Sequence, residues 1–317
     1  MIYVRNDETE QIRILPRIDD RVPSWNPHDL AERDCPFCNL SGAAKYIRPD
    51  GLNVHECAQC GSFYVSPTPS LEALYTFYSA YTQEHGAHVA QGKKNFIMKT
   101  ARAAFKISPL FDFRVAEISS VVKIQGKAVL DIGCGTGNDL IKFKNMGATV
   151  EGIDLDQTAI TIARDEMGLE NTKNCSIEDF NPEITYDVIL MMDLIEHIVD
   201  PLALLKKAKD YLNDHGVIAI WTPNASFIKR FADTTLLQVD LEHINYLTFE
   251  TCDYLTHALN LKLIHLESVG FANIQTYKEN IGERNALLGR LQSRCSNLLN
   301  KQDIRLGTYH LFALFTN

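Results

Sequence analysis

Four cysteines near the N-terminus have the spacing of a metal site. They form two Cys-x-x-Cys pairs, Cys35 with Cys38 and Cys57 with Cys60, which are separated by 18 residues. Four thiolates arranged in this way give the tetrahedral shell that Zn²⁺ accepts, and four protein ligands leave no open position for catalysis. We therefore predict a structural zinc ribbon that positions a substrate or partner. Two redox-active pairs, or unpaired thiols of the core, are the alternatives.

Acidic and imidazole side chains form a second group of candidate chemical residues. Asp193, Glu196 and His197 are three and four positions apart, so a helical segment would place them on one face. His243 comes later, just before an expected helix. Either histidine suits a general base near neutral pH, and a divalent metal is the other way to activate a hydroxyl. A structural turn without a catalytic role is the third interpretation.

A glycine-rich turn is the strongest single signal in the chain. Gly133, Gly135 and Gly137 alternate after an apolar run, with Asp131 two positions before the first glycine. Glycines let the backbone turn sharply and approach a ligand, and a helix that follows offers free N–H groups. Asp154 ends the next expected strand, where an acid can bind both hydroxyls of a ribose. The pattern indicates a nucleoside-like cofactor.

The elements that must position these residues alternate between short β-rich runs and helical periodicity. We expect Asp156 to cap the helix that begins at Gln157. The alternation predicts an α/β fold with a doubly wound, mostly parallel sheet. The expected strands are 127–132, 149–154, 186–192, 216–221, 262–267 and 309–315, and the expected helices are 138–146, 157–167, 201–212 and 248–259.

Changes of pattern along the chain suggest three parts. They are a leader with the zinc ribbon over 1–70, a helical connector over 71–124, and a core over 125–317 with a helical insertion near 275–305. The connector is expected to open with a helix over 71–81. It also carries Lys99, Arg102 and Lys106 on one helix face, as a solvated surface or a phosphate contact.

Composition bounds the class of protein. The chain has 317 residues, 22% charged and 45% hydrophobic, which is ordinary for a globular protein and excludes collagen-like or disordered chains. A net charge of −9 disfavours nonspecific nucleic-acid binding.

Because no apolar run approaches a membrane span and the first residues have no signal-peptide pattern, we expect a cytoplasmic protein. The other cysteines, Cys134, Cys175, Cys252 and Cys295, are expected to be small core residues.

The motif from Asp131 to Gly137, together with Gly152-Ile-Asp154, resembles the class I S-adenosylmethionine-dependent methyltransferases. The resemblance covers about residues 120–317. It implies a Rossmann-like sheet, S-adenosylmethionine as the cofactor, an adenine-framing segment at 176–180 and a fourth strand whose end faces the methyl group. The cofactor-binding residues that it implies are Asp131, Gly133, Cys134, Gly135, Gly137, Asp154, Leu155, Glu178, Asp179 and Met192.

A zinc ribbon before such a core resembles two groups of methyltransferases. One acts on sugars in polysaccharide or natural-product pathways, and the other on guanine in ribosomal RNA. The aromatic stretch 60–69 and the Tyr-rich segment 74–81 favour the first group. The chain is too short for the further domain of sugar C-methyltransferases, which favours transfer to oxygen or nitrogen. We expect O-methylation of a nucleotide-linked sugar or glycan precursor, with RNA base methylation as the alternative, which the pI of 5.6 disfavours.

Asp193, Glu196, His197 and His243 also resemble the metal set of the plant small-RNA 2′-O-methyltransferases. The resemblance implies a second divalent site, where the ion would bind two vicinal hydroxyls and acidify one of them. The first acid is Asp here rather than Glu, which shortens its reach. A scaffold with a degenerate core is a further alternative, against which the intact glycine turn argues. The sequence leaves the oligomeric state open, with 275–305 as a candidate interface of a homo-oligomer.

Overall fold

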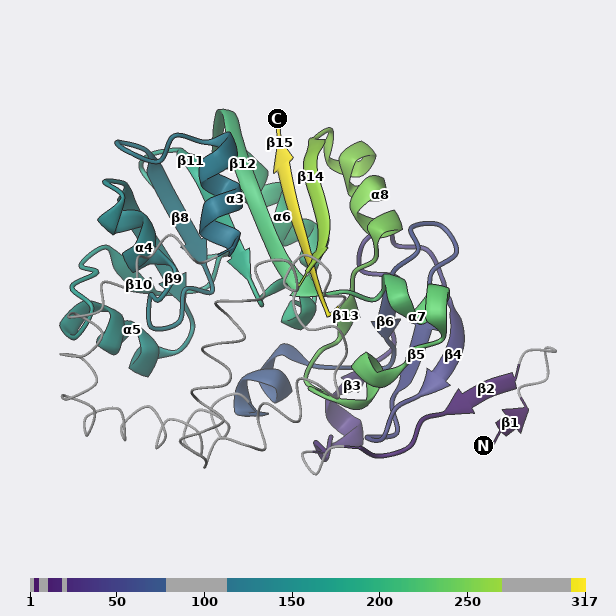
Figure 1. The fold of residues 1–317 in the computed structure, drawn as a ribbon. Coiled ribbons are helices and arrows are strands. Elements are labelled where there is room, and N and C mark those ends of the chain that lie inside the picture. Colours follow the sequence, from purple (N-terminus) through teal and green to yellow (C-terminus); the bar gives the residue numbers. More distant parts are fainter. Residues whose placement is uncertain (1–2, 6–10, 19–21, 78–112, 270–308) are drawn as a thin grey trace, which may run out of the picture. The chain divides into compact units, whose positions relative to one another are not determined.

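A computed structural model describes residues 3–5, 11–18, 22–77, 113–269 and 309–317 (Figure 1). The chain forms two compact units. The larger unit comprises Met1–Ser24, Ala31–Thr68 and Asn181–Asn317, and the smaller unit comprises Trp25–Leu30 and Pro69–Phe180. Among the described residues, no helix has the length and apolar character needed to cross a membrane.

The elements follow one another along the chain in an order close to the expected one. They are β1 (Tyr3–Arg5), β2 (Gln11–Ile14), η1 (Pro27–Asp29), β3 (Leu30–Ala31), β4 (Ala43–Ile47), β5 (Asn53–Glu56), β6 (Phe63–Val65), β7 (Thr68–Pro69), α3 (Phe113–Val121), β8 (Ala128–Ile132), α4 (Leu140–Asn145), β9 (Thr149–Asp154), α5 (Gln157–Asp165), β10 (Thr172–Asn174), β11 (Tyr186–Met192), η4 (Ile195–His197), α6 (Pro201–Asp210), β12 (Leu212–Pro223), α7 (Ser226–Phe231), η5 (Thr235–Gln238), β13 (Asn245–Tyr246), α8 (Phe249–Leu259), β14 (Lys262–Val269) and β15 (His310–Thr316).

Parallel strands form the centre of the smaller unit. β9 lies between β10 and β8 and pairs in parallel with both. The apolar residues Val129 and Leu130 of β8 are fully buried, as expected of a strand covered on both faces. α4 packs on β9, and α5 packs on β9 and β10. α5 begins where expected, because the Asp156 side chain accepts hydrogen bonds from the N–H groups of Thr158 and Ala159.

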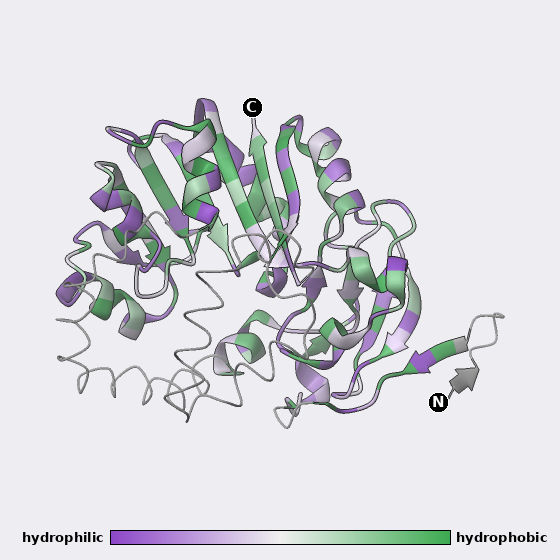
Figure 2. Ribbon diagram, viewed as in Figure 1, coloured by the Kyte–Doolittle hydropathy of each residue, from purple (hydrophilic) through white to green (hydrophobic). Residues whose placement is uncertain are grey.

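The larger unit continues this architecture with four strands in the order β11-β12-β15-β14. β11 and β12 are parallel, whereas β15 is antiparallel to both β12 and β14. Residues 188–191 of β11 are fully buried, and Figure 2 shows β11, β12 and β15 mostly in the colour of hydrophobic residues. α6 packs on β12 and α8 packs on β14 and β15. The expected Rossmann-like α/β fold with a mostly parallel sheet is confirmed.

A six-stranded sheet in the larger unit contains the N-terminal residues. Its order is β1-β2-β4-β5-β6-β13, so its last strand comes from far along the chain. β13 pairs antiparallel with β6, with Asn245 opposite Tyr64 and Tyr246 opposite Phe63. All three residues of β6 are buried. The segment that follows His243 is therefore part of the sheet that the N-terminal residues build.

The expected and observed bounds of the elements differ in places. The helix expected over 201–212 ends at Asp210, because Leu212 already pairs with Tyr186 as the first residue of β12. Residues 71–77 are helical as expected. The remainder of the 71–81 helix, the Lys99, Arg102 and Lys106 stripe, Cys295 and the insertion near 275–305 lie outside the described residues. The division into 1–70, 71–124 and 125–317 and the cytoplasmic location stay predictions.

Candidate active site

The glycine turn connects β8 to α4 in the smaller unit. Gly133, Gly135 and Gly137 have φ angles of 77°, 52° and 81°, in the left-handed region that residues with a Cβ rarely adopt. A Cβ at Gly137 would lie 2.1 Å from Cδ1 of Leu169, whereas none of the described atoms is within 4 Å of a Cβ built on Gly135. Gly137 is therefore required by packing, and Gly135 faces open space that a ligand can occupy.

Asp154, at the end of β9, braces this turn. Its Oδ2 accepts a hydrogen bond from the N–H of Gly135 at 2.7 Å, and its Oδ1 accepts one from the N–H of Asp156 at 2.8 Å. Burial raises the pKa of Asp154, against the effect of these two hydrogen bonds. Each carboxylate oxygen has a second lone pair, so the side chain can still accept from ribose hydroxyls. The sequence suggested the ribose contact but not the brace.

Asp131 is a buried acid on which the cations Arg114 and Lys142 act less strongly than burial does. It is 3% exposed, and its Oδ1 accepts no hydrogen bond from the residues that the structure describes. Burial raises the pKa of Asp131 well above its ordinary value, and the nearby Asp139 adds to this effect. A buried carboxylate oxygen without a hydrogen-bond donor is costly. A cofactor with positively charged ammonium and sulfonium groups, as S-adenosylmethionine has, fits this position.

The remaining predicted cofactor residues differ in exposure. Leu155 is 47% exposed directly after Asp154, and Cys134 is buried in the turn. Glu178 and Asp179 are exposed, and Asp179 accepts a hydrogen bond from the Ser176 hydroxyl at 3.0 Å. Met192 is half-buried at the end of β11 in the larger unit. The smaller unit thus brings together the predicted residues from 131 to 155.

Glu196, His197 and His243 meet in the larger unit. One ligand atom from each lies within 4.8 Å of the others. The rings of His197 and His243 have centroids 4.6 Å apart and planes inclined by 65°. The N–H of Ile244 donates to the backbone oxygen of Glu196 at 2.8 Å and so joins the two segments. The group follows the carboxyl end of β11, which is where α/β sheets place their ligands.

Burial controls the protonation of this group. Glu196 is 1% exposed, and its Oε2 accepts a hydrogen bond from the Thr222 hydroxyl at 2.9 Å. Its Oε1 is buried and accepts none from the described residues. Burial, followed by the nearby Asp193, raises the pKa of Glu196 to about 8. Burial, followed by His243, lowers the pKa of His197 well below its usual range, so this imidazole is neutral and able to ligate a metal or accept a proton.

Asp193 is not part of the described group, although the sequence placed it there. The chain leaves β11 with a φ of 52° at Asp193, and the 3-10 helix η4 contains only Ile195–His197. The expected helical face from Asp193 to His197 is therefore not formed, and the Asp193 side chain is exposed. Thr222, at the end of β12, is instead the polar neighbour of Glu196.

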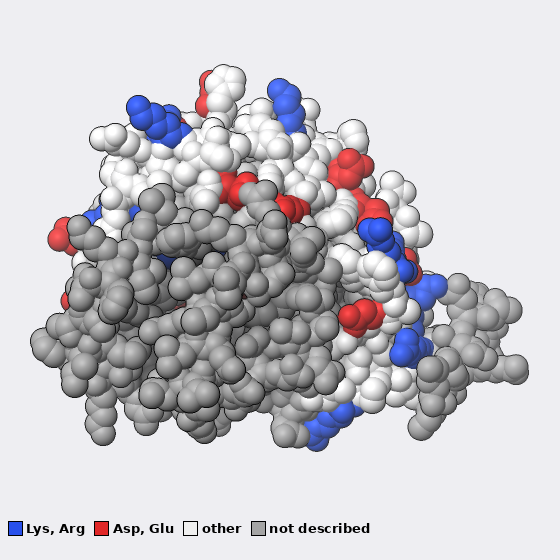
Figure 3. Space-filling model, in the orientation of Figure 1, with Lys and Arg blue, Asp and Glu red and all other residues white. Residues whose placement is uncertain are grey.

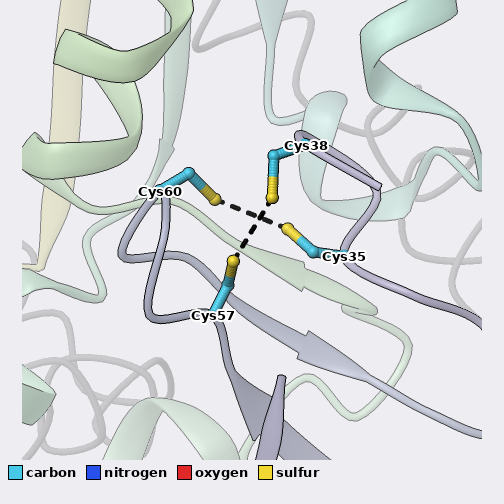
Figure 4. A group of neighbouring side chains, drawn as sticks. All are labelled: Cys35, Cys38, Cys57 and Cys60. Atoms are coloured by element: carbon cyan, nitrogen blue, oxygen red, sulfur yellow. Dashed lines mark hydrogen bonds between the residues drawn. The ribbon is translucent and has the colours of Figure 1, made fainter. Parts of the chain in front are cut away.

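The four N-terminal cysteines converge as their spacing predicted. Figure 4 shows their sulfurs pointing toward one another, and all four lie within 4.8 Å. The Sγ atoms are 3.4 Å apart in Cys35 and Cys60 and 3.3 Å apart in Cys38 and Cys57. A tetrahedral site with Zn–S bonds of about 2.3 Å separates its sulfurs by about 3.8 Å. The cluster therefore needs only a small expansion to hold Zn²⁺.

The family to which the chain belongs agrees with the α/β fold and the glycine turn. The methyltransferase domain family matches residues 107–266, which is half of the chain. The chain belongs to this family, and it is an S-adenosylmethionine-dependent methyltransferase.

Curated relatives match a shorter part of the chain. The ubiquinone biosynthesis O-methyltransferase of Actinobacillus pleuropneumoniae serotype 5b is 38% identical over 109 residues, which are 31% of this chain and 47% of that protein. The protein of the same name from Hydrogenovibrio crunogenus is 32% identical over 131 residues, which are 39% of this chain and 53% of that protein. The chain thus spans about half the length of these relatives.

Solved structures resemble the chain at low identity. An S-adenosylmethionine-dependent methyltransferase from Mesorhizobium loti has a TM-score of 0.47 and 14% identity, over 64% of this chain and 96% of that chain. One from Archaeoglobus fulgidus has a TM-score of 0.46 and 18% identity, over 69% of this chain and 99% of that chain.

The expected sugar acceptor and its RNA alternative are wrong, because the curated relatives are named for ubiquinone biosynthesis. The aromatic stretch that suggested sugars has a structural role, since Phe63 and Tyr64 are each 1% exposed in β6. On the face drawn in Figure 3, the described Lys and Arg side chains are scattered among acidic ones and form no broad basic patch.

Proposed function

We propose that this chain transfers the methyl group of S-adenosylmethionine to a hydroxyl of a small molecule. The acceptor class is a hydroxylated aromatic ring of the kind that a ubiquinone precursor provides. The names of the curated relatives support this class. The observation that carries the proposal is the convergence of Glu196, His197 and His243, which have the chemistry needed to activate a hydroxyl.

Glu196, His197 and His243 are proposed to bind a divalent cation. Two imidazoles and one carboxylate suit Mn²⁺, Fe²⁺ or Zn²⁺ better than Mg²⁺, which prefers oxygen ligands. The Glu196 carboxylate supports this role, because one of its oxygens is buried and accepts no hydrogen bond from the described residues. A cation at this position would lower the pKa of a hydroxyl bound to it, and two adjacent hydroxyls would bind it more tightly than one.

The chemical balance of the transfer is simple. The acceptor oxygen attacks the methyl carbon, the carbon–sulfur bond breaks, and S-adenosylhomocysteine leaves while the hydroxyl loses its proton. S-adenosylmethionine supplies a methyl group that is already activated, so the protein mainly aligns the reactants. Asp131 is proposed to hold the positively charged part of the cofactor and Asp154 its ribose. The four cysteines are proposed to hold a structural Zn²⁺ that takes no part in the reaction.

The test uses the purified full chain with methyl-labelled S-adenosylmethionine and two acceptors. Catechol carries adjacent hydroxyls, and hydroquinone is a matched control whose hydroxyls are too far apart to bind one cation. We expect label on catechol at a rate at least tenfold above that on hydroquinone. EDTA should abolish the transfer and added Mn²⁺ should restore it, with the zinc content measured in the same samples.

Each other result has a definite meaning. Transfer that survives EDTA would assign the histidines to general-base catalysis without a metal. Binding of S-adenosylmethionine by calorimetry without label on either acceptor would overturn the proposed acceptor class.

A further inference from the structure

Arg48 is a charged residue buried in the N-terminal sheet. It follows β4, in the turn before β5, where a sequence containing Pro49, Asp50 and Gly51 would suggest a solvated loop. The side chains of Arg48 and Asp50 are nevertheless both 0% exposed and form an ion pair. A buried guanidinium is retained only where its donors are satisfied, so its hydrogen-bond partners indicate its role.

The partners of Arg48 lie on the segment that carries His243. Its Nη1 donates to the backbone oxygen of His243 at 2.6 Å and to the hydroxyl of Tyr246 at 2.9 Å. Its Nη2 donates to the backbone oxygen of Leu241 at 2.6 Å. The Tyr246 hydroxyl in turn donates to the backbone oxygen of His243 at 3.2 Å. Two donors therefore converge on the carbonyl of one candidate site residue.

Arg33 makes a second link, close to the cysteine cluster. Its Nη2 donates to the backbone oxygen of Ile244 at 2.7 Å and to Oδ1 of Asn245 at 2.9 Å. The Nδ2 of Asn245 donates to the backbone oxygens of Ile195 and Ile198 at 2.9 and 2.6 Å. Arg33 and Asn245 thus tie the His243 segment to both ends of the η4 turn, which carries Glu196 and His197.

We propose that Arg48 and Arg33 are positioning residues, which hold His243 against Glu196 and His197 from the cysteine-bearing N-terminal sheet. The inference rests on the proposed function of that group. It gives the N-terminal sheet a role in the reaction without any contact with substrate. The guanidinium suits this role, because it presents five donors in a rigid plane and binds several fixed carbonyls at once.

The test compares three conservative variants of the full chain. Arg48→Lys keeps the charge next to Asp50 but loses the planar set of donors. Tyr246→Phe is the milder variant, which keeps the ring and removes only the hydroxyl. Arg13→Lys is the matched control, because Arg13 lies on β2 of the same sheet, opposite Tyr46 of β4.

Kinetics with catechol give the first readout. We expect Arg48→Lys to lower kcat by roughly ten- to hundredfold and Tyr246→Phe by a smaller factor, because a small displacement of a catalytic group has effects of this size. The KM for S-adenosylmethionine should stay within about twofold of the parent, since Asp131 and Asp154, which are proposed to hold the cofactor, belong to the smaller unit. Arg13→Lys should match the parent. A kcat within about twofold of the parent for Arg48→Lys would overturn the proposal.

The second readout does not require activity. In spectra of protein labelled with ¹⁵N-histidine, the ring signals of His197 and His243 are assigned from variants of each. We expect these signals to move in Arg48→Lys and Tyr246→Phe but not in Arg13→Lys. Unmoved signals in folded Arg48→Lys would overturn the positioning role even if no acceptor is methylated. If the parent chain methylates neither acceptor but the histidine signals still move in Arg48→Lys and Tyr246→Phe, the positioning role is supported and the proposed function fails.

Discussion

His197 and His243 lie edge to face, with ring centroids 4.6 Å apart. His197 belongs to the η4 turn that follows β11 in the sequence, and His243 precedes β13 of the N-terminal sheet. Two adjacent imidazoles, one buried at His243 and one half-buried at His197, cannot both carry a charge without a large cost, which agrees with the lowered pKa of His197. The pair is therefore suited to ligate a metal as neutral imidazoles, and it forms only because two distant segments of the chain meet.

Replacement of His243 by alanine tests the site directly. We expect His243→Ala to lower kcat with the catechol acceptor at least a hundredfold, because it removes a proposed metal ligand. The control is His257→Ala, at an exposed position of α8. Steady-state kinetics of both variants give the comparison. Activity of His243→Ala within about threefold of the parent would eliminate this residue as ligand or base.

Cofactor affinity is expected to depend on pH through Asp131. Its raised pKa means that the carboxyl takes up a proton at a higher pH than an ordinary aspartate. A positively charged cofactor binds the ionised form, so affinity should fall as the pH is lowered through this pKa and reach its plateau above it. The fall approaches about tenfold per pH unit below the pKa. Calorimetry with S-adenosylmethionine at a series of pH values, from neutral pH downward, measures it.

The matched variant for this pH dependence is Asp131→Asn, which keeps the shape of the side chain and cannot ionise. We expect weaker binding with little change over the same pH range. A slope in Asp131→Asn equal to that of the parent would assign the dependence to another group, such as Asp154, whose pKa burial also raises.

Two glycines of the turn should respond differently to alanine. Gly137→Ala forces a methyl group to 2.1 Å from Leu169 at a φ of 81° and should destabilise the fold by about 2–5 kcal/mol. Gly135→Ala meets only an unfavourable φ and should cost about 1–2 kcal/mol. Its methyl group would point into the space assigned to the cofactor. We therefore expect folded Gly135→Ala protein with cofactor affinity at least tenfold weaker, measured by urea unfolding and calorimetry. Unchanged affinity would refute this use of the space.

The cysteine cluster should hold metal and support folding. Cys38→Ser removes one of four ligands and is expected to lower the metal content by one equivalent and the free energy of unfolding by several kcal/mol. Elemental analysis and thermal melting measure the two effects. Cys175→Ser is the control, at a half-exposed position of the smaller unit. A Cys38→Ser protein with the parent's metal content would contradict the zinc assignment.

Sequence reasoning succeeded where the information is local. The glycine turn, the Asp156 cap and the apolar run of β11 each depend on residues a few positions apart, and the structure has them where they were expected. The spacing of Cys35 and Cys38 likewise places two of the four clustered thiols close together before any tertiary contact forms. The Asp193 expectation did not agree with the structure, because helical spacing was assumed where the chain makes a left-handed turn and a short 3-10 helix.

The sequence by itself determined the cofactor-binding chemistry, the two cysteine pairs and the α/β class, because short-range periodicity and spacing encode them. Only the tertiary structure decided that His243 meets Glu196. It also decided that Arg48 is buried and donates to the backbone oxygen of His243, rather than lying in a solvated turn. It also decided that Asp154 braces the Gly135 turn. These contacts join residues far apart in the chain, and they depend on which strands pair and in which register, which local pattern does not specify.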